Sequence, residues 1–227
     1  MKAVVLAGGS GTRLRPLTIN KPKVMVEVKG EPMLVHILRG LKPHVEEVVL
    51  VVGYLKEKVI DYFGNEFEGL KINYVVQSDS KGTGHALLCA EAEIEAPFLL
   101  VYGDLYFNPK VYYEVLSQDS AGVIVAKTVP NPESYGVLEV TDGLITDILE
   151  KVPNPPSDLI NAGIYYLPPE IFEACRQVEL SERGEYELTD AVELLINSGL
   201  EFKPVVIDEW VDVGTIDRLK RAEEMVF

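Results

Sequence analysis

The chain has 227 residues, 47% hydrophobic and 25% charged, which is enough to bury one large core but too few for two full domains. The chain has 21 lysine and arginine residues and 36 aspartate and glutamate residues, so its formal charge is −15. Because of this negative charge, neither nucleic acid nor an anionic membrane is expected as a partner. The sequence therefore predicts a single domain over residues 1–227.

Residues 1–7 form a short apolar run at the start of the chain. This run is too short for the core of a signal peptide or for a membrane span, and it is typical of a buried strand. Cys89 and Cys175 form no Cys-x-x-Cys pattern and the histidines are scattered, so neither a disulfide framework nor a zinc site is indicated. We expect a cytoplasmic protein with no membrane partner.

The first half of the chain alternates apolar runs with helical patterns. Strands are expected near residues 2–6, 47–52, 72–76 and 98–101, and helices near 34–41, 56–62 and 85–92. Such a βαβ series places helices on both faces of a mainly parallel sheet. The sequence predicts an α/β fold of this kind.

The second half has closely spaced strands separated by turn residues. They are expected near residues 121–127, 136–140, 144–150 and 162–167, with helices near 188–198 and 216–226. This spacing predicts a small antiparallel subregion within a mixed sheet. The proline-rich stretch 152–156 is short and is followed at once by another apolar run, which favours a surface loop over a domain linker.

A glycine-rich loop with flanking cations follows the first strand. Backbone amides at Gly8, Gly9 and Gly11 can converge on an anion, because glycine permits positive φ angles and close approach. Full positive charge follows at Arg13, Arg15, Lys21 and Lys23. A plain tight turn is the alternative, but the cations favour a phosphate-binding loop at the end of a strand.

Two better-known glycine motifs do not fit this loop. The phosphate loop of nucleotide hydrolases needs a Gly-Lys-Ser/Thr triplet, and none follows. The dinucleotide fingerprint, started at Gly9, would need a third glycine where Leu14 stands. A nicotinamide-dependent dehydrogenase is therefore disfavoured.

The loop resembles the signature of the sugar-1-phosphate nucleotidyltransferases, also called nucleoside-diphosphate-sugar pyrophosphorylases: Leu-Ala-Gly-Gly-x-Gly-Thr-Arg-Leu-x-Pro-Leu-Thr, followed by Pro-Lys. The resemblance recurs along nearly the whole chain and implies a Rossmann-like fold. In that family the loop wraps the nucleoside triphosphate. This implies nucleotide binding by Leu6, Ala7, Gly8, Gly9, Gly11, Thr12 and Arg13. The resemblance also implies two catalytic cations, Arg13 on the departing pyrophosphate and Lys23 near the reacting phosphates.

The resemblance also has implications for the domain content of the chain and for its oligomeric state. Many relatives carry a C-terminal β-helical extension, and this chain ends where it would begin, so we expect the short form. Residues 1–104 would mainly bind the nucleotide and residues 105–227 mainly the sugar phosphate. Relatives are commonly dimers or tetramers, so a homo-oligomer is expected, although the sequence leaves the number of copies open.

Two aspartates are candidates for a metal site. Asp104 follows an apolar strand and a glycine, and Asp212 lies in the alternating segment that begins at Trp210. Taken alone, each could be a turn-capping or exposed strand residue. Together they look like the family's two magnesium-binding positions, and Mg²⁺ prefers a few carboxylate oxygens completed by phosphate and water.

The segment Gln77 to Leu87 resembles the family's base-recognition segment, with Gln77, Gly82 and Thr83 as nucleotide-binding residues. A glutamine amide can pair with a pyrimidine edge because it donates and accepts at once. The Gly-Thr-Gly-His-Ala-Leu form is similar to that of uridylyl- and thymidylyltransferases, which favours UTP or dTTP. The plainer interpretation is a glycine turn with Thr83 capping the following helix and His85 structural.

The sugar-phosphate residues implied by the resemblance are Gly136, Glu150, Lys151 and Asn161. Glu150 and Asn161 can hydrogen-bond sugar hydroxyls, and the Gly136 amide can approach the ring. Lys151 can pair with the sugar phosphate. Each is also an ordinary turn or strand-end residue, and their order and spacing favour the joint interpretation. The nearby run Glu185 to Asp190 also resembles a family segment, but it reads equally well as a helix entry.

We therefore expect a magnesium-dependent enzyme that transfers a nucleotidyl group from UTP or dTTP to a sugar 1-phosphate, with glucose 1-phosphate favoured. Three alternatives remain open: N-acetylglucosamine 1-phosphate as the sugar substrate, a mannose-1-phosphate guanylyltransferase, and a non-catalytic sugar-nucleotide-binding regulatory subunit. Such subunits often lose catalytic cations or carboxylates. All four are present here: Arg13, Lys23, Asp104 and Asp212.

Overall fold

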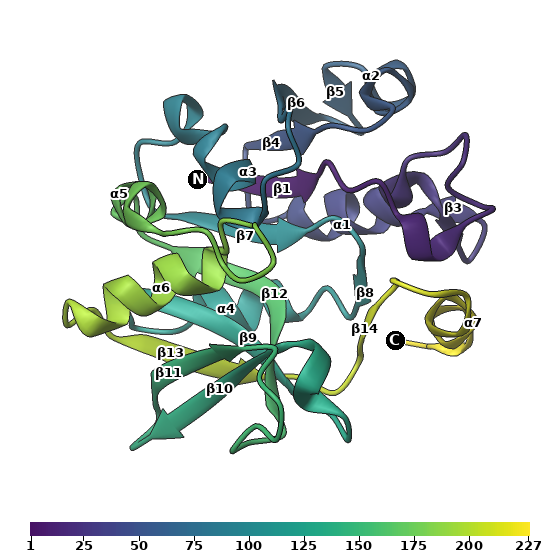
Figure 1. Ribbon diagram of the computed structural model, residues 1–227. Helices are drawn as coiled ribbons and strands as arrows, with labels where there is room; N and C mark the ends of the chain where they lie inside the picture. Colours follow the sequence, from purple (N-terminus) through teal and green to yellow (C-terminus); the bar gives the residue numbers. More distant parts are fainter.

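Four parallel strands form the centre of a ten-stranded mixed sheet in the computed structural model, which describes residues 1–227 (Figure 1). These strands are β1 (Lys2–Ala7), β4 (Glu47–Val52), β6 (Leu70–Val76) and β7 (Phe98–Tyr102). The short strand β5 (Glu66–Phe67) closes one edge, antiparallel to β6. The buried valine and leucine runs of the first half therefore form the predicted parallel core of the sheet.

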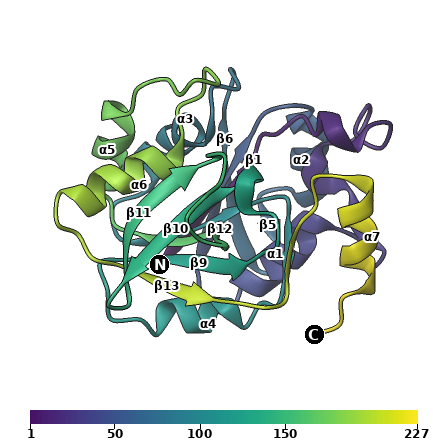
Figure 2. The same ribbon diagram turned by 60° about the horizontal axis from the view of Figure 1, so that its bottom comes forward.

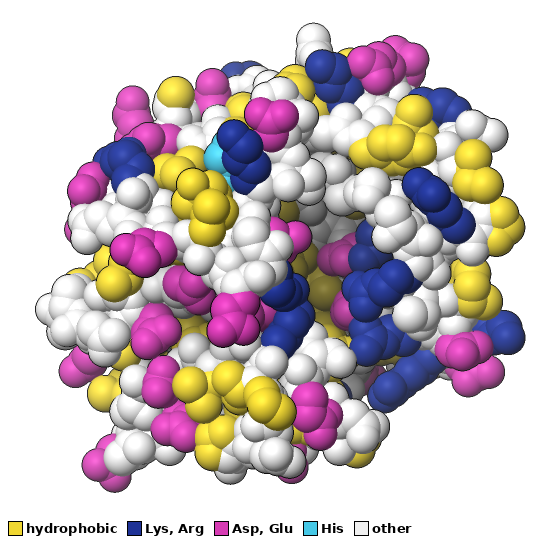
Figure 3. All heavy atoms as spheres, viewed as in Figure 1, with side chains coloured by type: hydrophobic (Ala, Val, Ile, Leu, Met, Phe, Trp, Pro, Cys, Tyr) yellow, Lys and Arg dark blue, Asp and Glu magenta, His cyan; other side chains and the backbone are white.

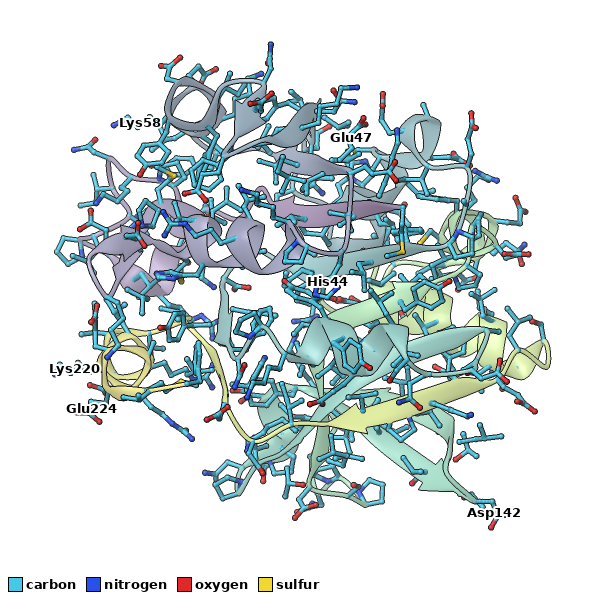
Figure 4. The ribbon with its side chains drawn as sticks, turned by 180° about the vertical axis from the view of Figure 1, so that it is seen from behind. His44, Glu47, Lys58, Asp142, Lys220 and Glu224 are labelled. Carbon is cyan, nitrogen blue, oxygen red and sulfur yellow. The ribbon has the colours of Figure 1, made fainter.

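The second half extends this sheet with mostly antiparallel strands. β12 (Leu159–Leu167) pairs antiparallel with β7, with β10 (Gly136–Thr141) and with β9 (Gly122–Thr128). β11 (Leu144–Glu150) pairs with β10, and β13 (Phe202–Val206) runs parallel to β9. Figure 2 brings these strands forward, and Figure 4 labels Asp142 at the tip of the β10–β11 hairpin. The predicted antiparallel subregion is confirmed, and it continues the main sheet.

Helices cover both faces of the sheet. Side chains alternate along β1, so that Val5 packs in the core on one face and Val4 in the core on the other. The face that receives Val5 is covered by α1 (Met33–Leu41), α2 (Lys56–Phe63) and α4 (Val111–Leu116). The opposite face is covered by α3 (Thr83–Leu88), α5 (Ile171–Gln177) and α6 (Leu188–Asn197). The predicted α/β, Rossmann-like fold is confirmed.

A small third core lies beside the main sheet and carries the end of the chain. It joins the helix α7 (Ile216–Glu224) to two small sheets, one formed by β2 (Glu27–Val28) and β3 (Glu31–Pro32), the other by β8 (Leu105–Phe107) and β14 (Trp210–Asp212). The side chain of Thr215 caps α7 by accepting from the Arg218 amide at 3.4 Å. Because β14 pairs antiparallel with β8, the segment after Trp210 is brought beside the end of β7.

Some elements differ from the sequence-based expectations. The helix expected near 85–92 is α3 followed by a separate 3-10 turn, Glu91–Glu93. The short helices α4 and α5 and the strand β13 were not predicted. In α4, valine and tyrosine favour strands as much as helices, and six residues are too few to show a period. In β13, Pro204 argues against a strand, and it is tolerated because β13 lies at an edge and pairs only with β9.

The sheet order creates a switch point at β1. The chain proceeds from β1 to β4 and β6 on one side, whereas β7 lies on the other side of β1. In such sheets ligands bind in the crevice where connections diverge at the carboxyl ends of the strands. The glycine-rich loop after β1 and Asp104 after β7 both lie at that edge. None of the helices combines the length and the apolar composition that crossing a bilayer requires.

Candidate active site

Two adjoining cavities lie at the carboxyl ends of β1 and β7. The larger has a volume of about 420 Å³ and the smaller about 220 Å³, and they share four wall residues: Thr83, Tyr102, Asp104 and Glu185. Figure 3 shows this face of the molecule hollowed, with lysine and arginine side chains along the walls of the hollow. The geometry therefore provides two compartments that meet at Asp104.

The predicted site residues divide between the two compartments. The smaller cavity is lined by Leu6, Gly8, Gly9, Lys23, Gln77, Gly82, Thr83 and Asp104. The larger is lined by Arg13, Thr83, Asp104, Gly136, Glu150, Lys151, Asn161 and Asp212. Three predicted residues line neither cavity: Ala7, which is buried in β1, and Gly11 and Thr12. The structure thus gathers most of the predicted residues: the predicted sugar set lines the larger cavity, and the rest of the predicted nucleotide set lines the smaller one except for Arg13, which lines the larger.

The glycine loop owes its turn to Gly11. This residue has a φ of +62°, and a Cβ there would lie 2.9 Å from Thr18 Cγ2 and 3.1 Å from Lys23 Cβ. The Thr18 hydroxyl donates to the Gly11 carbonyl at 2.6 Å. Gly8 and Gly9 do not have positive φ, so the expectation of left-handed freedom holds only for Gly11 among the three. Gly11 shapes the loop and allows Lys23 to pack beneath it.

Of the four loop cations, two reach the cavities. Arg13 lines the larger cavity and Lys23 the smaller. Arg15 is exposed and lines neither, and Lys21 pairs with Glu27 at 2.8 Å on the surface. The expectation that all four cations supply the phosphate site with charge is therefore wrong in these two positions. Only Arg13 and Lys23 are therefore placed to contact a ligand in these cavities.

The two predicted metal-site aspartates lie together in a compact charge cluster. Lys23 Nζ donates to Asp104 Oδ2 and lies 3.9 Å from Asp212 Oδ1. On the other side, Arg218 Nη1 donates to Asp212 Oδ2 at 2.6 Å. The backbone amide of Val213 donates to the Asp104 carbonyl at 2.9 Å, which ties the two segments together. Two carboxylates thus face one another across Lys23.

The Asp212 carboxylate has the burial and the surroundings that suit a metal ligand. Burial raises the pKa of its carboxyl, and the nearby charge of Asp104 raises that pKa further, while Lys23 and Arg218 oppose the shift. Its Oδ1 is buried and accepts no hydrogen bond, which is costly for a carboxylate oxygen. Such an oxygen beside a second carboxylate fits a divalent cation that takes two protein oxygens and completes its shell with phosphate and water.

The Gln77 amide is held from one side in the smaller cavity. Its Nε2 lies 3.1 Å from the Gly82 carbonyl and 3.1 Å from His85 Nδ1. The hydroxyl of Thr83 does not cap α3. It accepts from the amide of Leu188 at 3.0 Å and so supports the start of α6 instead. The interpretation of Thr83 as a helix cap for its own helix is therefore wrong.

The sugar-side residues form a connected polar wall. Glu150 Oε2 accepts from the Thr189 hydroxyl at 3.2 Å, and Lys151 Nζ pairs with Glu150 Oε1 at 2.8 Å. A Cβ at Gly136 would lie 2.8 Å from Glu150 Oε2, so a larger residue there would displace the end of the Glu150 side chain. Asn161 donates to the Tyr165 hydroxyl and accepts from the Gly163 amide at 2.9 Å. These contacts fix the orientation of both polar side chains.

Several further residues of the larger cavity were given no binding role from the sequence, although Trp210 and the run Glu185 to Asp190 were noted there. They are Tyr102, Leu105, Ser134, Tyr135, Ala162, Gly163, Arg183, Glu185, Glu187, Thr189, Trp210 and Arg218. Arg183 pairs with Glu187 and lies 3.5 Å from Glu150. The run from Glu185 to Asp190 was the available signal. It is indeed a helix entry, because α6 begins at Leu188, and it also forms a wall of the cavity.

An aromatic wall closes the same cavity. The Tyr135 and Trp210 rings meet edge to face with centroids 6.0 Å apart, and the Arg218 guanidinium lies 5.3 Å from the Tyr135 centroid. The Trp210 indole donates to the Ala162 carbonyl at 2.8 Å. Arg218 therefore connects Asp212 to the aromatic wall.

Comparisons with known proteins find relatives that match nearly the whole chain. The profile of the nucleotidyl transferase family matches residues 2–226. The UTP–glucose-1-phosphate uridylyltransferase AglF of Haloferax volcanii is 43% identical over 232 residues, which cover 99% of this chain and 96% of the relative. The bifunctional protein GlmU of Methanococcus vannielii is 44% identical over 223 residues, covering 94% of this chain but only 52% of the relative. A solved UDP-glucose pyrophosphorylase complexed with UDP-glucose matches with a TM-score of 0.88 and 25% identity, covering 98% of this chain and 96% of that one.

Proposed function

The chain belongs to the nucleotidyl transferase family and is a sugar-1-phosphate nucleotidyltransferase, and from that premise we propose that it uses UTP or dTTP with glucose 1-phosphate. The observation that carries the proposal is the pair of cavities that meet at Asp104. One has the glycine loop and an amide suited to a base, and the other has hydroxyl-binding side chains suited to a sugar. The 43% identity to a UTP–glucose-1-phosphate uridylyltransferase supports these substrates.

In the proposed reaction an oxygen of the sugar 1-phosphate attacks the α-phosphorus of the nucleoside triphosphate. A new phosphorus–oxygen bond forms, and the bond to the pyrophosphate oxygen breaks with its electron pair. The attacking phosphate is already ionised near neutral pH, so no protein nucleophile or general base is needed. Positioning and neutralisation of charge are the chemistry left to the protein.

Roles for the nucleotide side follow from position. Arg13 and Lys23, the two loop cations that reach the cavities, would offset the charge on the triphosphate and on the leaving pyrophosphate. Gln77 and Gly82 would read the base. The remaining proposed nucleotide-binding residues supply loop and wall contacts: Leu6, Ala7, Gly8, Gly9, Gly11, Thr12 and Thr83.

Roles for the sugar side follow in the same way. Glu150 and Asn161 would accept from or donate to sugar hydroxyls, and the Gly136 backbone would lie against the ring. Lys151 would exchange part of its pairing with Glu150 for the sugar phosphate. On this proposal residues 105–227 mainly serve the sugar phosphate.

The proposal includes Mg²⁺ held by Asp104 and Asp212. The buried Asp212 Oδ1, which has no hydrogen-bond partner, supports this assignment. When bound, the ion would neutralise phosphate oxygens of both substrates. Without it, Lys23 and Arg218 are the cations that keep the two carboxylates from repelling one another.

The test is pyrophosphate release by the purified protein with Mg²⁺. UTP, dTTP, GTP, ATP and CTP are each combined with glucose, mannose, galactose and N-acetylglucosamine 1-phosphates. We expect release that requires both substrates and is greatest with UTP or dTTP and glucose 1-phosphate. Pyrophosphate release with GTP and mannose 1-phosphate instead would show that these are the substrates. Binding of a sugar nucleotide without any pyrophosphate release would show a regulatory subunit.

A matched pair of variants tests the site assignment. Asp104→Asn keeps the size of the side chain but removes the charge, and we expect a loss of turnover of about a hundredfold or more. Asp208→Asn, at an exposed position outside both cavities, is the control and should retain turnover. Full turnover in the Asp104 variant would overturn the assignment.

A further inference from the structure

We propose that His85 is a positioning residue that fixes the Gln77 amide, so that the base site presents a hydrogen-bond acceptor and selects bases with a ring N–H. The inference rests on the proposed function, because it takes the smaller cavity as the nucleotide site. It goes beyond the expected role of His85, which was structural.

The orientation of the amide follows from its partners. A backbone carbonyl can only accept, so the Gln77 atom 3.1 Å from the Gly82 carbonyl must be the amide nitrogen. The same nitrogen lies 3.1 Å from His85 Nδ1. Nδ1 therefore accepts, and the ring proton of the neutral imidazole lies on Nε2. Both N–H groups of the amide are then engaged within the protein.

The other end of the amide faces the ligand space. Gln77 Oε1 accepts no hydrogen bond from the chain, and it lies 3.2 Å from the position that a Cβ on Gly8 would occupy. Gly8 and Gln77 both line the smaller cavity. The amide was expected to donate and accept at once. In the structure its donors are occupied, and only an acceptor is left for the base.

An acceptor at this point divides the bases into two groups. Uracil and thymine carry N3–H and guanine carries N1–H, each of which can donate to Gln77 Oε1. The corresponding ring nitrogens of cytosine and adenine carry lone pairs and would face another acceptor. Leaving these groups unpaired should weaken binding about tenfold to a hundredfold.

His85 is needed because Gly82 alone occupies only one of the two amide N–H groups. If the amide rotated by half a turn, its oxygen would face both the Gly82 carbonyl and the Nδ1 lone pair, two repulsive contacts. The backbone of His85 is anchored in its own helix, where the His85 carbonyl accepts from the Cys89 amide and from Cys89 Sγ, both at 3.3 Å. The ring therefore holds the amide in one orientation.

Three variants separate this role from a structural one. His85→Leu keeps the bulk of the side chain but removes the acceptor. His85→Asn places an acceptor near the position of Nδ1 and is the conservative rescue. Cys89→Ala, one turn along α3, removes a contact to the His85 carbonyl without touching Gln77 and is the control.

The experiment measures equilibrium binding of UTP, dTTP, GTP, CTP and ATP, together with inorganic tripolyphosphate, in the absence of any sugar phosphate. We expect the wild-type protein to bind the best of UTP, dTTP and GTP at least about tenfold more tightly than CTP. His85→Leu should reduce that ratio by about tenfold and leave tripolyphosphate affinity unchanged. His85→Asn should restore the ratio, and Cys89→Ala should keep it.

Three results would overturn the inference: wild-type affinity for CTP equal to that for the best of UTP, dTTP and GTP, an unchanged ratio in His85→Leu, or an equal loss for all nucleotides and tripolyphosphate in that variant. Because no turnover is measured, the outcome is separate from that of the proposed function. A protein that selects among bases but releases no pyrophosphate with any sugar phosphate would contradict the proposed function and leave the role of His85 standing.

Discussion

The two cavities are built in different ways. The smaller is formed mainly by two local segments, the loop after β1 and the turn from β6 into α3, and much of its polar surface is backbone. The larger takes its walls from many segments far apart in the sequence, and its polar surface is mostly charged side chains. The nucleotide side is thus a local motif, whereas the sugar side is a tertiary assembly.

The difference extends to how the polar groups are satisfied. On the nucleotide side Gln77 Oε1 is free for a ligand. On the sugar side the cations are already paired: Lys151 and Arg183 with Glu150, and Arg218 with Asp212. A sugar phosphate must therefore exchange with internal ion pairs, and so must a triphosphate that binds Lys23, whereas the base meets an amide that is already oriented. Binding costs less free energy when the protein groups that contact the ligand are already ordered.

Lys23 is the position where the two sides meet, because it lines the smaller cavity and pairs with Asp104. Lys23→Ala should reduce kcat/KM about a hundredfold to a thousandfold, since a cation aimed at the reacting phosphates is lost. Steady-state rates with both substrates varied would show this. Lys21→Ala removes a cation that pairs with Glu27 on the surface and should stay within about twofold. An equal reduction of kcat/KM in the two variants would show that Lys23 contributes no more to the reaction than a surface cation does.

Glu150→Gln tests whether the sugar side acts separately from the nucleotide side. The variant weakens the pairing that orders Lys151 and Arg183, and we expect the KM for the sugar phosphate to rise about tenfold to a hundredfold. The KM for the nucleotide should stay the same. Initial rates with one substrate saturating at a time give both values, and Glu133→Gln, at an exposed position outside the cavity, is the control. A rise in both KM values would show that the two cavities do not bind their substrates separately.

Arg218→Ala tests the ion pair that connects Asp212 to the aromatic wall. Removing the guanidinium takes away a 2.6 Å bond to Asp212 and a cation over Tyr135. We expect the KM for the sugar phosphate to rise about fivefold to tenfold with the preference among bases unchanged. The exposed Arg221 lies on the same helix, and Arg221→Ala should have no effect on either quantity. An altered base preference in the Arg218 variant would contradict the separation of the two cavities.

Glu47→Gln tests the scaffold at the opposite end of the parallel strands (labelled in Figure 4). Glu47 begins β4 and binds Lys2 at 3.0 Å, Lys71 at 3.3 Å and Asn73 at 2.8 Å. The hydrogen bond from Lys2 is the main cause that lowers the pKa of Glu47 below its usual 4.5, with burial opposing it. Because the folded-state pKa is depressed, this stabilisation is complete above 4.5 and is lost as the pH falls through the lower folded value.

The Glu47 variant should lose about 1 kcal/mol of unfolding free energy at neutral pH, and its difference from the wild type should shrink in acid. Urea denaturation at several pH values measures this. Activity at neutral pH should stay unchanged, since Glu47 is far along β4 from both cavities. The exposed Glu46→Gln is the control, and a pH-independent difference for Glu47→Gln would contradict the ion-pair explanation.

Elements with strong local signals were predicted well. The strands at 47–52 and 144–150 have the predicted bounds, because a buried central strand is a continuous apolar run and the hairpin strand lies between clear turn residues. The glycine loop, Asp104 and the Gln77 segment were found because each is a strand end followed by polar residues. Arg183 and Arg218 were missed, since a lone arginine near a helix start looks like any solvated cation.

The sequence by itself determined the parallel core, the position of the glycine loop and the residue types available at the two cavities. These follow from side-chain periodicity and backbone freedom, which act over a few neighbouring residues. Only the tertiary structure decided that Arg15 and Lys21 line neither cavity, that Asp212 faces Asp104 across Lys23, and that His85 holds Gln77 with its oxygen outward. Those outcomes depend on which groups from distant segments compete for the same partner, and this is settled only when the sheet and its small side core have packed.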